Sequence, residues 1–199
     1  MDAHPDDSAI TAVVCNEDLW YFRLGSRLGL YRAELTHSAV DGGTMAVPRS
    51  ELGYWRARLG ELRAGGLAHG AARGLFVHDS VHARQMRGQP FWLWGLRYVL
   101  DRRFRRRIEQ EAYTVHLVYL ARCGLTLERS YWAGRFEKLY FGAFDESAAL
   151  RLFDRIASAV RAAVPGARIV GHVERSDAAP PCAPWLANAG AASGREARR

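Results

Sequence analysis

Two segments that lie far apart in the sequence constrain the fold most, FVHDSVHARQ at 76–85 and RRRIEQEAYTVH at 105–116. His78 and His82 are four residues apart, so on an α-helix they differ by about 40° in azimuth and about 6 Å along the axis. Both imidazoles can therefore ligate one metal ion, provided that a third ligand comes from elsewhere in the chain. This pattern favours a pair of helices that share a metal site.

The second segment offers two candidates for the third ligand, Glu109 and Glu111. The two positions are about 200° apart on a helix, so only one of them can face the metal. The other is then solvated or paired with the arginines of 102–107. Asp79 follows the first histidine, where a general base would take a proton from a metal-activated water.

Taken together, these residues resemble the small gluzincin-type metalloprotease-like families, whose pattern is H-E-L-x-H-x-x-Q followed by E-x-E/Q-A. The resemblance covers residues 74–118 and rests on His78, His82, Gln85, Glu109, Glu111 and Ala112. It implies a Zn²⁺ site with His78, His82 and Glu109 as ligands, and a peptide or protein as substrate. It also implies that Ala112 lets the two helices approach closely. His116 follows Glu109 by seven residues and lies on nearly the same helix face, so we expect it just behind the ligands.

The chain departs from this pattern at Asp79, where the family has glutamate. Aspartate is one methylene shorter, which draws the carboxylate back by about 1.5 Å. A catalytic group misplaced by about 1 Å can cost on the order of 100-fold in rate. We therefore expect metal binding together with amide hydrolysis that is weak or lost. A catalytically inactive domain that keeps the metal or binds a partner is the first alternative.

A basic module that binds nucleic acid or a membrane surface is the second alternative, because DRRFRRR at 101–107 adds to a formal net charge of +7. We favour a solvated helix face for these arginines, with Phe104 and Ile108 turned inward. The aromatic run PFWLW at 90–94 either packs the helix pair or forms an exposed apolar patch for a partner or a membrane surface.

A second, shorter metal-like pattern is RIVGHVERSDAAPPCAPWL at 168–186. It is similar to the last strand of zinc-dependent N-acetylmuramoyl-L-alanine amidases, which implies His172 and Cys182 as ligands. We expect instead a surface strand that runs into a disordered tail.

The fold class expected from these patterns is α+β, mostly helical, with a small N-terminal β element beside the helix pair. We expect a flexible N-terminus at 1–9, one domain at 10–175 and a disordered tail at 176–199. Helical spacing predicts helices over 51–64, 74–87, 91–122 and 146–164. Short apolar runs predict strands in AITAVV, LWYFRL, LGLYRAEL, TMAVP and ARIVGHV. TMAVP is also the nearest candidate for an edge strand that aligns a peptide substrate.

Composition predicts a cytoplasmic protein. The N-terminus MDAHPDDSAITAVV is acidic and has no sustained apolar core. The most apolar stretch, PFWLWGLRYVL at 90–100, is too short to cross a bilayer and contains Arg97. Cys15, Cys123 and Cys182 form no CxxC pair, so neither a disulfide framework nor a thiolate zinc site is expected.

Overall fold

The computed structural model describes residues 9–27, 38–40, 42–139 and 144–171, and it confirms a mostly helical α+β fold. The α-helices of these residues are α1 (Trp20–Arg27), α2 (Leu52–Arg63), α3 (Ala71–Met86), α4 (Phe91–Leu100), α5 (Arg102–Arg122), α6 (Arg129–Leu139) and α7 (Glu146–Ala163). The strands are β1 (Ala12–Cys15), β2 (Ser38–Val40), β3 (Thr44–Val47), β4 (Leu127–Glu128) and β5 (Ile169–Val170), and short 3₁₀ turns lie at η1 (Asn16–Asp18) and η3 (Arg49–Glu51).

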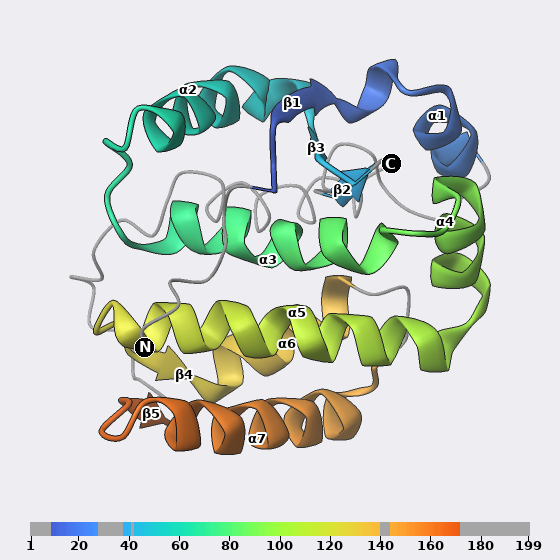
Figure 1. Ribbon diagram of the computed structural model, residues 1–199. Coiled ribbons are helices and arrows are strands. Elements are labelled where there is room, and N and C mark those ends of the chain that lie inside the picture. The colour runs from blue at the N-terminus through green and yellow to red at the C-terminus, as the bar shows by residue number, and fades with distance from the viewer. Residues whose placement is uncertain (1–8, 28–37, 41, 140–143, 172–199) are drawn as a thin grey trace, which may run out of the picture.

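The elements are stacked in layers with α3 in the middle. Figure 1 shows the three-stranded sheet and α2 on one side of α3, α5 on its other side, and α7 beyond α5. One group of buried side chains fills the space between the sheet, α2 and α3, and includes Met45, Trp55 and Phe76. A second joins α5, α6 and α7, and includes Leu117 and Phe153. Because α3 is covered on both sides, its polar residues need partners inside the protein.

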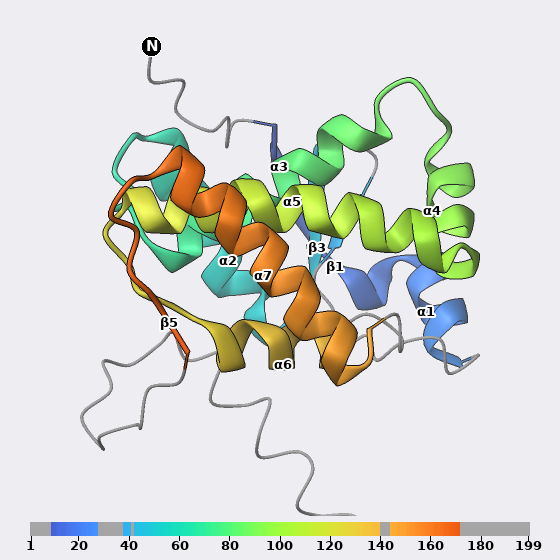
Figure 2. The same ribbon diagram turned by 90° about the horizontal axis from the view of Figure 1, so that it is seen from below.

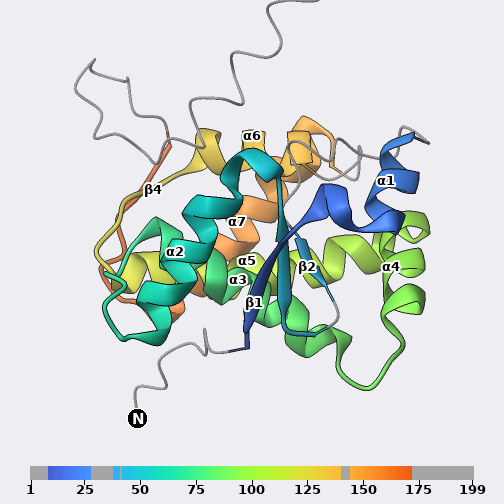
Figure 3. The same cartoon turned by 90° about the horizontal axis from the view of Figure 1, so that it is seen from above.

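The three-stranded sheet has the order β1-β3-β2, with β1 parallel and β2 antiparallel to β3. The strands expected in AITAVV and TMAVP are confirmed as β1 and β3. However, β3 is the central strand and is hydrogen-bonded on both edges, so the expectation that TMAVP is an edge strand for a peptide substrate is wrong. Figure 3 shows β1 and β2 flanking β3.

The segment LWYFRL forms most of helix α1 and not the expected strand. Its aromatic residues favour strands intrinsically, but their tertiary contacts decide the outcome. Phe22 is buried with Ala46 of β3, and the ring of Tyr21 lies 5.2 Å from that of Phe91. The strand expected in LGLYRAEL lies outside the described residues.

The single helix expected over 91–122 is divided at Asp101. The carboxylate of Asp101 accepts hydrogen bonds from the backbone N–H groups of Arg103 and Phe104, both over 2.9 Å, and so caps the start of α5. The chain turns there, and α4 runs across the end of α5 (Figures 1 and 2).

Arg105 is buried and donates to the carbonyl oxygens of Tyr98 and Val99 at the end of α4. The expectation of a solvated face is therefore wrong for this arginine.

The helix expected over 146–164 is confirmed as α7, with Asp145 accepting the backbone N–H of Ala148 over 2.7 Å. Helix α2 also lies where it was expected. Helix α6 and strand β4 were not expected, and β4 pairs in parallel with β5, which lies within ARIVGHV. None of the helices in the described part of the chain combines the length and the apolar character needed to cross a bilayer.

Candidate metal centre

Three buried side chains converge between α3 and α5. The Nε2 atoms of His78 and His82 are 3.1 Å apart, which places both imidazoles on the face of α3 that meets α5. The carboxylate of Glu109 lies 3.7 Å from His78 Nε2 through Oε2 and 3.5 Å from His82 Nε2 through Oε1. One ligand atom from each residue lies within 4.8 Å of the others, so the group can hold a metal ion. We call these residues the His–His–Glu triad.

The triad is almost completely shielded from solvent. His78 and His82 are each 6% exposed and Glu109 is 2% exposed. Glu109 Oε2 has no hydrogen-bond partner among the described residues, although a buried carboxylate oxygen normally has one. A cation between the three side chains would satisfy this oxygen and both Nε2 lone pairs at once. The donor set therefore fits a metal ion.

The electrostatics of the two histidines differ. Burial lowers the pKa of His78 well below its ordinary value, and the neighbouring His82 lowers it further. Burial also opposes charge on His82, but the attraction and the hydrogen bond of the Glu109 carboxylate outweigh it and raise the pKa of His82 to about 9. His78 is thus held neutral, as a metal ligand must be, while a metal ion has to displace a proton from the second histidine.

Gln85 fixes the orientation of His82. The Gln85 Nε2 group donates to the carbonyl oxygen of Ile108 over 3.1 Å and to Glu111 Oε2 over 3.0 Å. Its Oε1 atom is therefore the acceptor that lies 2.8 Å from His82 Nδ1, so that this nitrogen carries the hydrogen. Once a metal ion has displaced the proton of His82 Nε2, the lone pair of this nitrogen points into the triad, in the tautomer that a metal requires.

Tyr98 fixes the orientation of the Glu109 carboxylate, as Gln85 does for His82. Its hydroxyl donates to Glu109 Oε1 over 2.8 Å. Burial and the nearby carboxylate raise the pKa of Tyr98 well above its ordinary value, so the phenol remains a donor. Sequence reasoning missed Tyr98, because α4 was expected to continue straight into α5. A straight helix would have carried residue 98 three turns away from residue 109.

Aromatic rings surround the two imidazoles. The ring of His78 lies 4.5 Å from that of Tyr113, and the ring of His82 lies 6.0 Å from that of Trp94. Trp94 in turn stacks on Tyr98 at 5.2 Å. These apolar walls exclude water, which strengthens every electrostatic interaction inside the site.

The structure separates the two candidate glutamates. Glu109 belongs to the triad, whereas Glu111 is exposed and contacts Gln85.

Asp79 is buried at 3% exposure and lies near enough to His82 to raise the pKa of this histidine. The ligand roles of the triad and the catalytic role of Asp79 stay predictions. His172 and Cys182 lie outside the described residues.

Gly74 lies at a tight contact between α3 and α5. A Cβ atom built on Gly74 would lie 2.7 Å from His116 Nε2 and 2.8 Å from Leu120 Cδ2. Helix α3 begins at Ala71, so this glycine is inside the helix and not at its start as expected. Ala112 is also fully buried in α5. A glycine within a helical pattern was the available signal for this contact.

His116 lies beside the triad but outside it. Its ring is 5.6 Å from that of His78, and burial, with a smaller effect of Arg135, lowers its pKa to about 3. His116 is thus a neutral neighbour of the first histidine. Its place beside His78 agrees with the position expected from its seven-residue spacing to Glu109.

Comparison of the chain with protein-family models, with curated proteins and with solved structures finds no match. The resemblance to gluzincin-type families is carried by the residues of the site alone.

Proposed function

We propose that the protein is a zinc-dependent hydrolase of the metallopeptidase type, in which the His–His–Glu triad holds the ion. The observation that carries the proposal is the convergence of two imidazole Nε2 atoms and one carboxylate in a buried space. Two histidines and a glutamate form the ligand set of one class of catalytic zinc sites. Borderline-soft Zn²⁺ suits imidazole nitrogen together with a single carboxylate oxygen.

Each of the residues around the triad would then have a separate role in the hydrolysis. When bound, zinc supplies a Lewis acid for a water molecule and a peptide carbonyl. The carboxylate of Asp79 accepts the proton of the attacking water and passes it to the leaving amine. Gln85 keeps His82 in the ligating tautomer, and Tyr98 holds one oxygen of Glu109 so that the other faces the ion.

A second candidate function, a metal-binding domain without catalysis, is favoured by the burial of the site. A catalytic zinc site keeps one position open to water or substrate, whereas a structural site is closed. All three triad residues are at most 6% exposed. Asp79 also replaces the longer glutamate of the peptidase pattern. In this case the ion would stabilise the α3–α5 pair, in the way that structural zinc contributes to folding.

Metal content is the first test of both candidates. Protein purified without chelator is analysed by plasma mass spectrometry as wild type, His78→Ala, Glu109→Ala and Glu111→Ala. We expect about one zinc per chain in the wild type and in Glu111→Ala, and its loss in the other two. The Glu111→Ala variant removes a carboxylate from the same helix outside the triad. A wild type that neither retains nor takes up zinc, with its fold intact by circular dichroism, would overturn the proposal.

Peptide hydrolysis separates the two candidates. Wild type, Asp79→Asn and Asp79→Glu are compared on a mixture of unstructured peptides, with cleavage followed by mass spectrometry. Catalysis predicts that Asp79→Asn loses activity while keeping zinc, and that Asp79→Glu changes the rate by about tenfold or more, because it moves the carboxylate by one methylene. Bound zinc without hydrolysis in all three proteins would assign the site to the metal-binding domain.

A further inference from the structure

The large exposed apolar side chains of the described residues gather on two short helices. They are Trp20 at 66% and Leu24 at 49% on α1, and Trp92 at 68%, Leu93 at 37%, Leu96 at 50% and Leu100 at 72% on α4. Leu125 is the one member of this class elsewhere in the described part of the chain. We call the six side chains the α1–α4 apolar face.

Helix α4 is apolar on all sides. Its inner side carries Trp94 and Tyr98, which pack beside the triad, and its outer side carries Trp92, Leu96 and Leu100 at a spacing of four residues. The sequence FWLWGLRYVL contains a single charged residue, Arg97. A helix that is hydrophobic all round is normally covered on all sides, yet the outer side of α4 is open.

Helix α1 extends this surface. The rings of Trp20 and Tyr21 lie 5.8 Å apart, and Tyr21 contacts Phe91, so aromatic contacts run from α1 to the start of α4. Figures 1 and 3 show the two helices as neighbours at one end of the molecule. By helical spacing, Arg23 and Arg27 lie on the same side of α1 as its exposed apolar residues.

The charges that border the apolar face are positive. Every charged residue of α1 and α4 is an arginine. The acidic residues just before α1, Glu17 and Asp18, pair with Arg49 over 3.3 and 2.5 Å. Asp101, at the end of α4, is engaged as the cap of α5.

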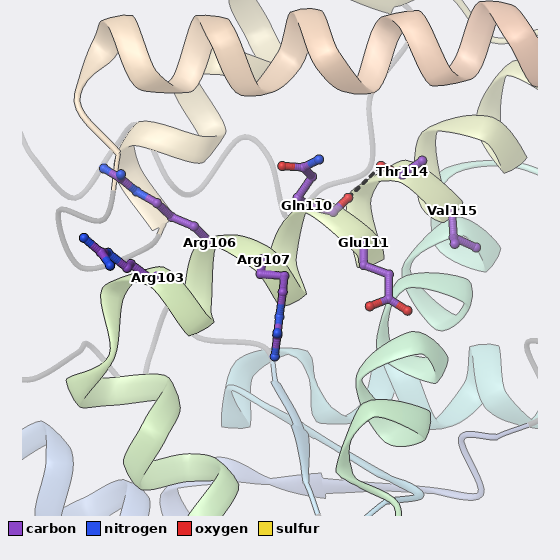
Figure 4. Close-up of a pocket in the computed structure, with 7 residues that line it drawn as sticks. All are labelled: Arg103, Arg106, Arg107, Gln110, Glu111, Thr114 and Val115. Carbon is purple, nitrogen blue, oxygen red and sulfur yellow. Dashed lines mark hydrogen bonds between the residues drawn. The ribbon is translucent and has the colours of Figure 1, made fainter.

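More arginines continue from this border onto α5. The guanidinium groups of Arg97 and Arg107 both lie over the ring of Phe104, at 4.3 and 5.7 Å from its centre. Arg107 also lines an open groove of about 580 Å³ with Arg103 and Arg106. Glu111 lines the same groove, so its charged residues are three arginines and one carboxylate. Figure 4 shows Arg103 and Arg106 extending in the same direction from the first turns of α5. The positive border is thus continuous with an arginine-lined groove.

We propose that the α1–α4 apolar face docks on the surface of an anionic lipid bilayer. Tryptophan and leucine on the outer side of a short helix, bordered by arginine, suit the boundary between headgroups and acyl chains. Ten residues of α4 extend about 15 Å, half of the hydrocarbon thickness of about 30 Å, so the helix lies in the membrane surface. The arginines of the border and of the groove contact the lipid phosphates.

Nucleic acid fits this surface less well. A phosphate backbone would place the arginines at the centre of the contact, whereas here they surround an apolar centre. A bilayer with anionic headgroups satisfies both the apolar centre and the positive border. The opposite side of α4 holds Tyr98 against Glu109, so docking would place the triad one helix away from the membrane. The proposal itself does not depend on the identity of the metal.

Co-sedimentation of the full chain with vesicles tests this proposal. Vesicles of phosphatidylcholine alone are compared with vesicles containing about one third phosphatidylglycerol. The proteins are wild type, the triple variant Trp92→Ser/Leu96→Ser/Leu100→Ser, the double variant Arg23→Gln/Arg27→Gln, and Leu125→Ser. The last is the matched control, because it replaces an exposed leucine outside the apolar face. Thermal melting checks that each variant is folded.

We expect the wild type and Leu125→Ser to bind the anionic vesicles about tenfold or more tightly than the neutral ones, and less tightly as salt rises from about 0.1 M to about 1 M. The triple variant should lose this binding by about tenfold or more, and the double variant by several-fold. Absence of wild-type binding, or equal binding by the triple variant, would overturn the proposal. So would a concentration-dependent dimer that the triple variant abolishes without any vesicle binding, since this would assign the face to a second copy of the chain.

Discussion

The hydroxyl of Tyr98 donates a hydrogen bond to the carboxylate of Glu109 over 2.8 Å, across the break between α4 and α5. The two residues are eleven positions apart, and they meet only because Asp101 ends one helix and starts the next. The bond engages Oε1, which also lies 3.5 Å from His82 Nε2. It leaves Oε2, 3.7 Å from His78 Nε2, without a hydrogen bond among the described residues. The position of the Glu109 carboxylate, a candidate metal ligand, therefore depends on the packing of a helix that contributes no residue to the triad.

Replacing Tyr98 by phenylalanine should weaken metal binding by about tenfold, because partners of the ligands commonly contribute about 10–100-fold to metal affinity. The ring keeps its stacking on Trp94, so only the hydroxyl is removed. Zinc affinity measured by competition with a fluorescent chelator gives the readout. Tyr54→Phe on α2, far from the triad in sequence, serves as the control. Unchanged affinity in Tyr98→Phe would show that the hydroxyl does not position Glu109.

Replacing Gln85 by alanine should lower zinc affinity by about 10–100-fold, because His82 Nδ1 loses the acceptor that fixes its tautomer. Gln85→Glu restores an acceptor at this position and should recover part of the affinity. Glu111→Ala removes only the outer contact of Gln85 and should leave affinity near the wild-type value. The same competition assay ranks the three variants. A loss in Glu111→Ala as large as that in Gln85→Ala would contradict the assignment.

Gly74→Ala should destabilise the fold by about 1–3 kcal/mol, since the added methyl group lies 2.7 Å from His116 Nε2 and overpacks the α3–α5 contact. Gly60→Ala in α2 is the matched control, because no atom lies within 4 Å of its Cβ position. That change should stabilise the protein by about 0.5–1 kcal/mol, the usual gain of alanine over glycine inside a helix. Urea unfolding measures both. Two effects of the same sign would contradict this account of Gly74.

The histidines of the triad could be predicted from the sequence because their relation is local. Residues four apart on a helix share a face whatever the rest of the fold does. Glu109 and Glu111 could be assigned to different faces for the same reason. Which of these faces meets α3 is a matter of tertiary packing, and the sequence left it open. The structure places Glu109 inside, with Ala112 and His116 on the same side of α5.

Tyr98 and α1 could not be predicted because both depend on contacts between distant segments. The break at Asp101 had a local signal, an aspartate before a run of helical residues, but the apolar spacing over 91–122 masked it. LWYFRL was expected as a strand from its aromatic content, and packing against Phe91 and Ala46 makes it a helix. Local patterns thus identified the candidate ligands, and long-range packing determined their surroundings.

Asp101 should make the stability of the protein depend on pH in the acidic range. Its hydrogen bonds from the backbone of Phe104 and Arg103, and the nearby arginines, hold its pKa below the ordinary value. A carboxyl group whose pKa is lower in the folded than in the unfolded protein stabilises the fold above about pH 4, and this contribution is lost as the pH falls through the lowered pKa. The effect matters here because α5 begins with five arginines in its first six residues, at the end of the helix where its dipole disfavours cations.

Asp101→Asn keeps a capping oxygen but does not titrate. We expect this variant to melt below the wild type at pH 7, and the difference in melting temperature to shrink toward zero as the pH falls to about 2. Glu137→Gln is the control for the general effect of losing an exposed carboxylate, because Glu137 lies on α6 and not at the start of α5. A difference between Asp101→Asn and the wild type that stays constant from pH 7 to about 2 would show that the charge of Asp101 does not stabilise the start of α5.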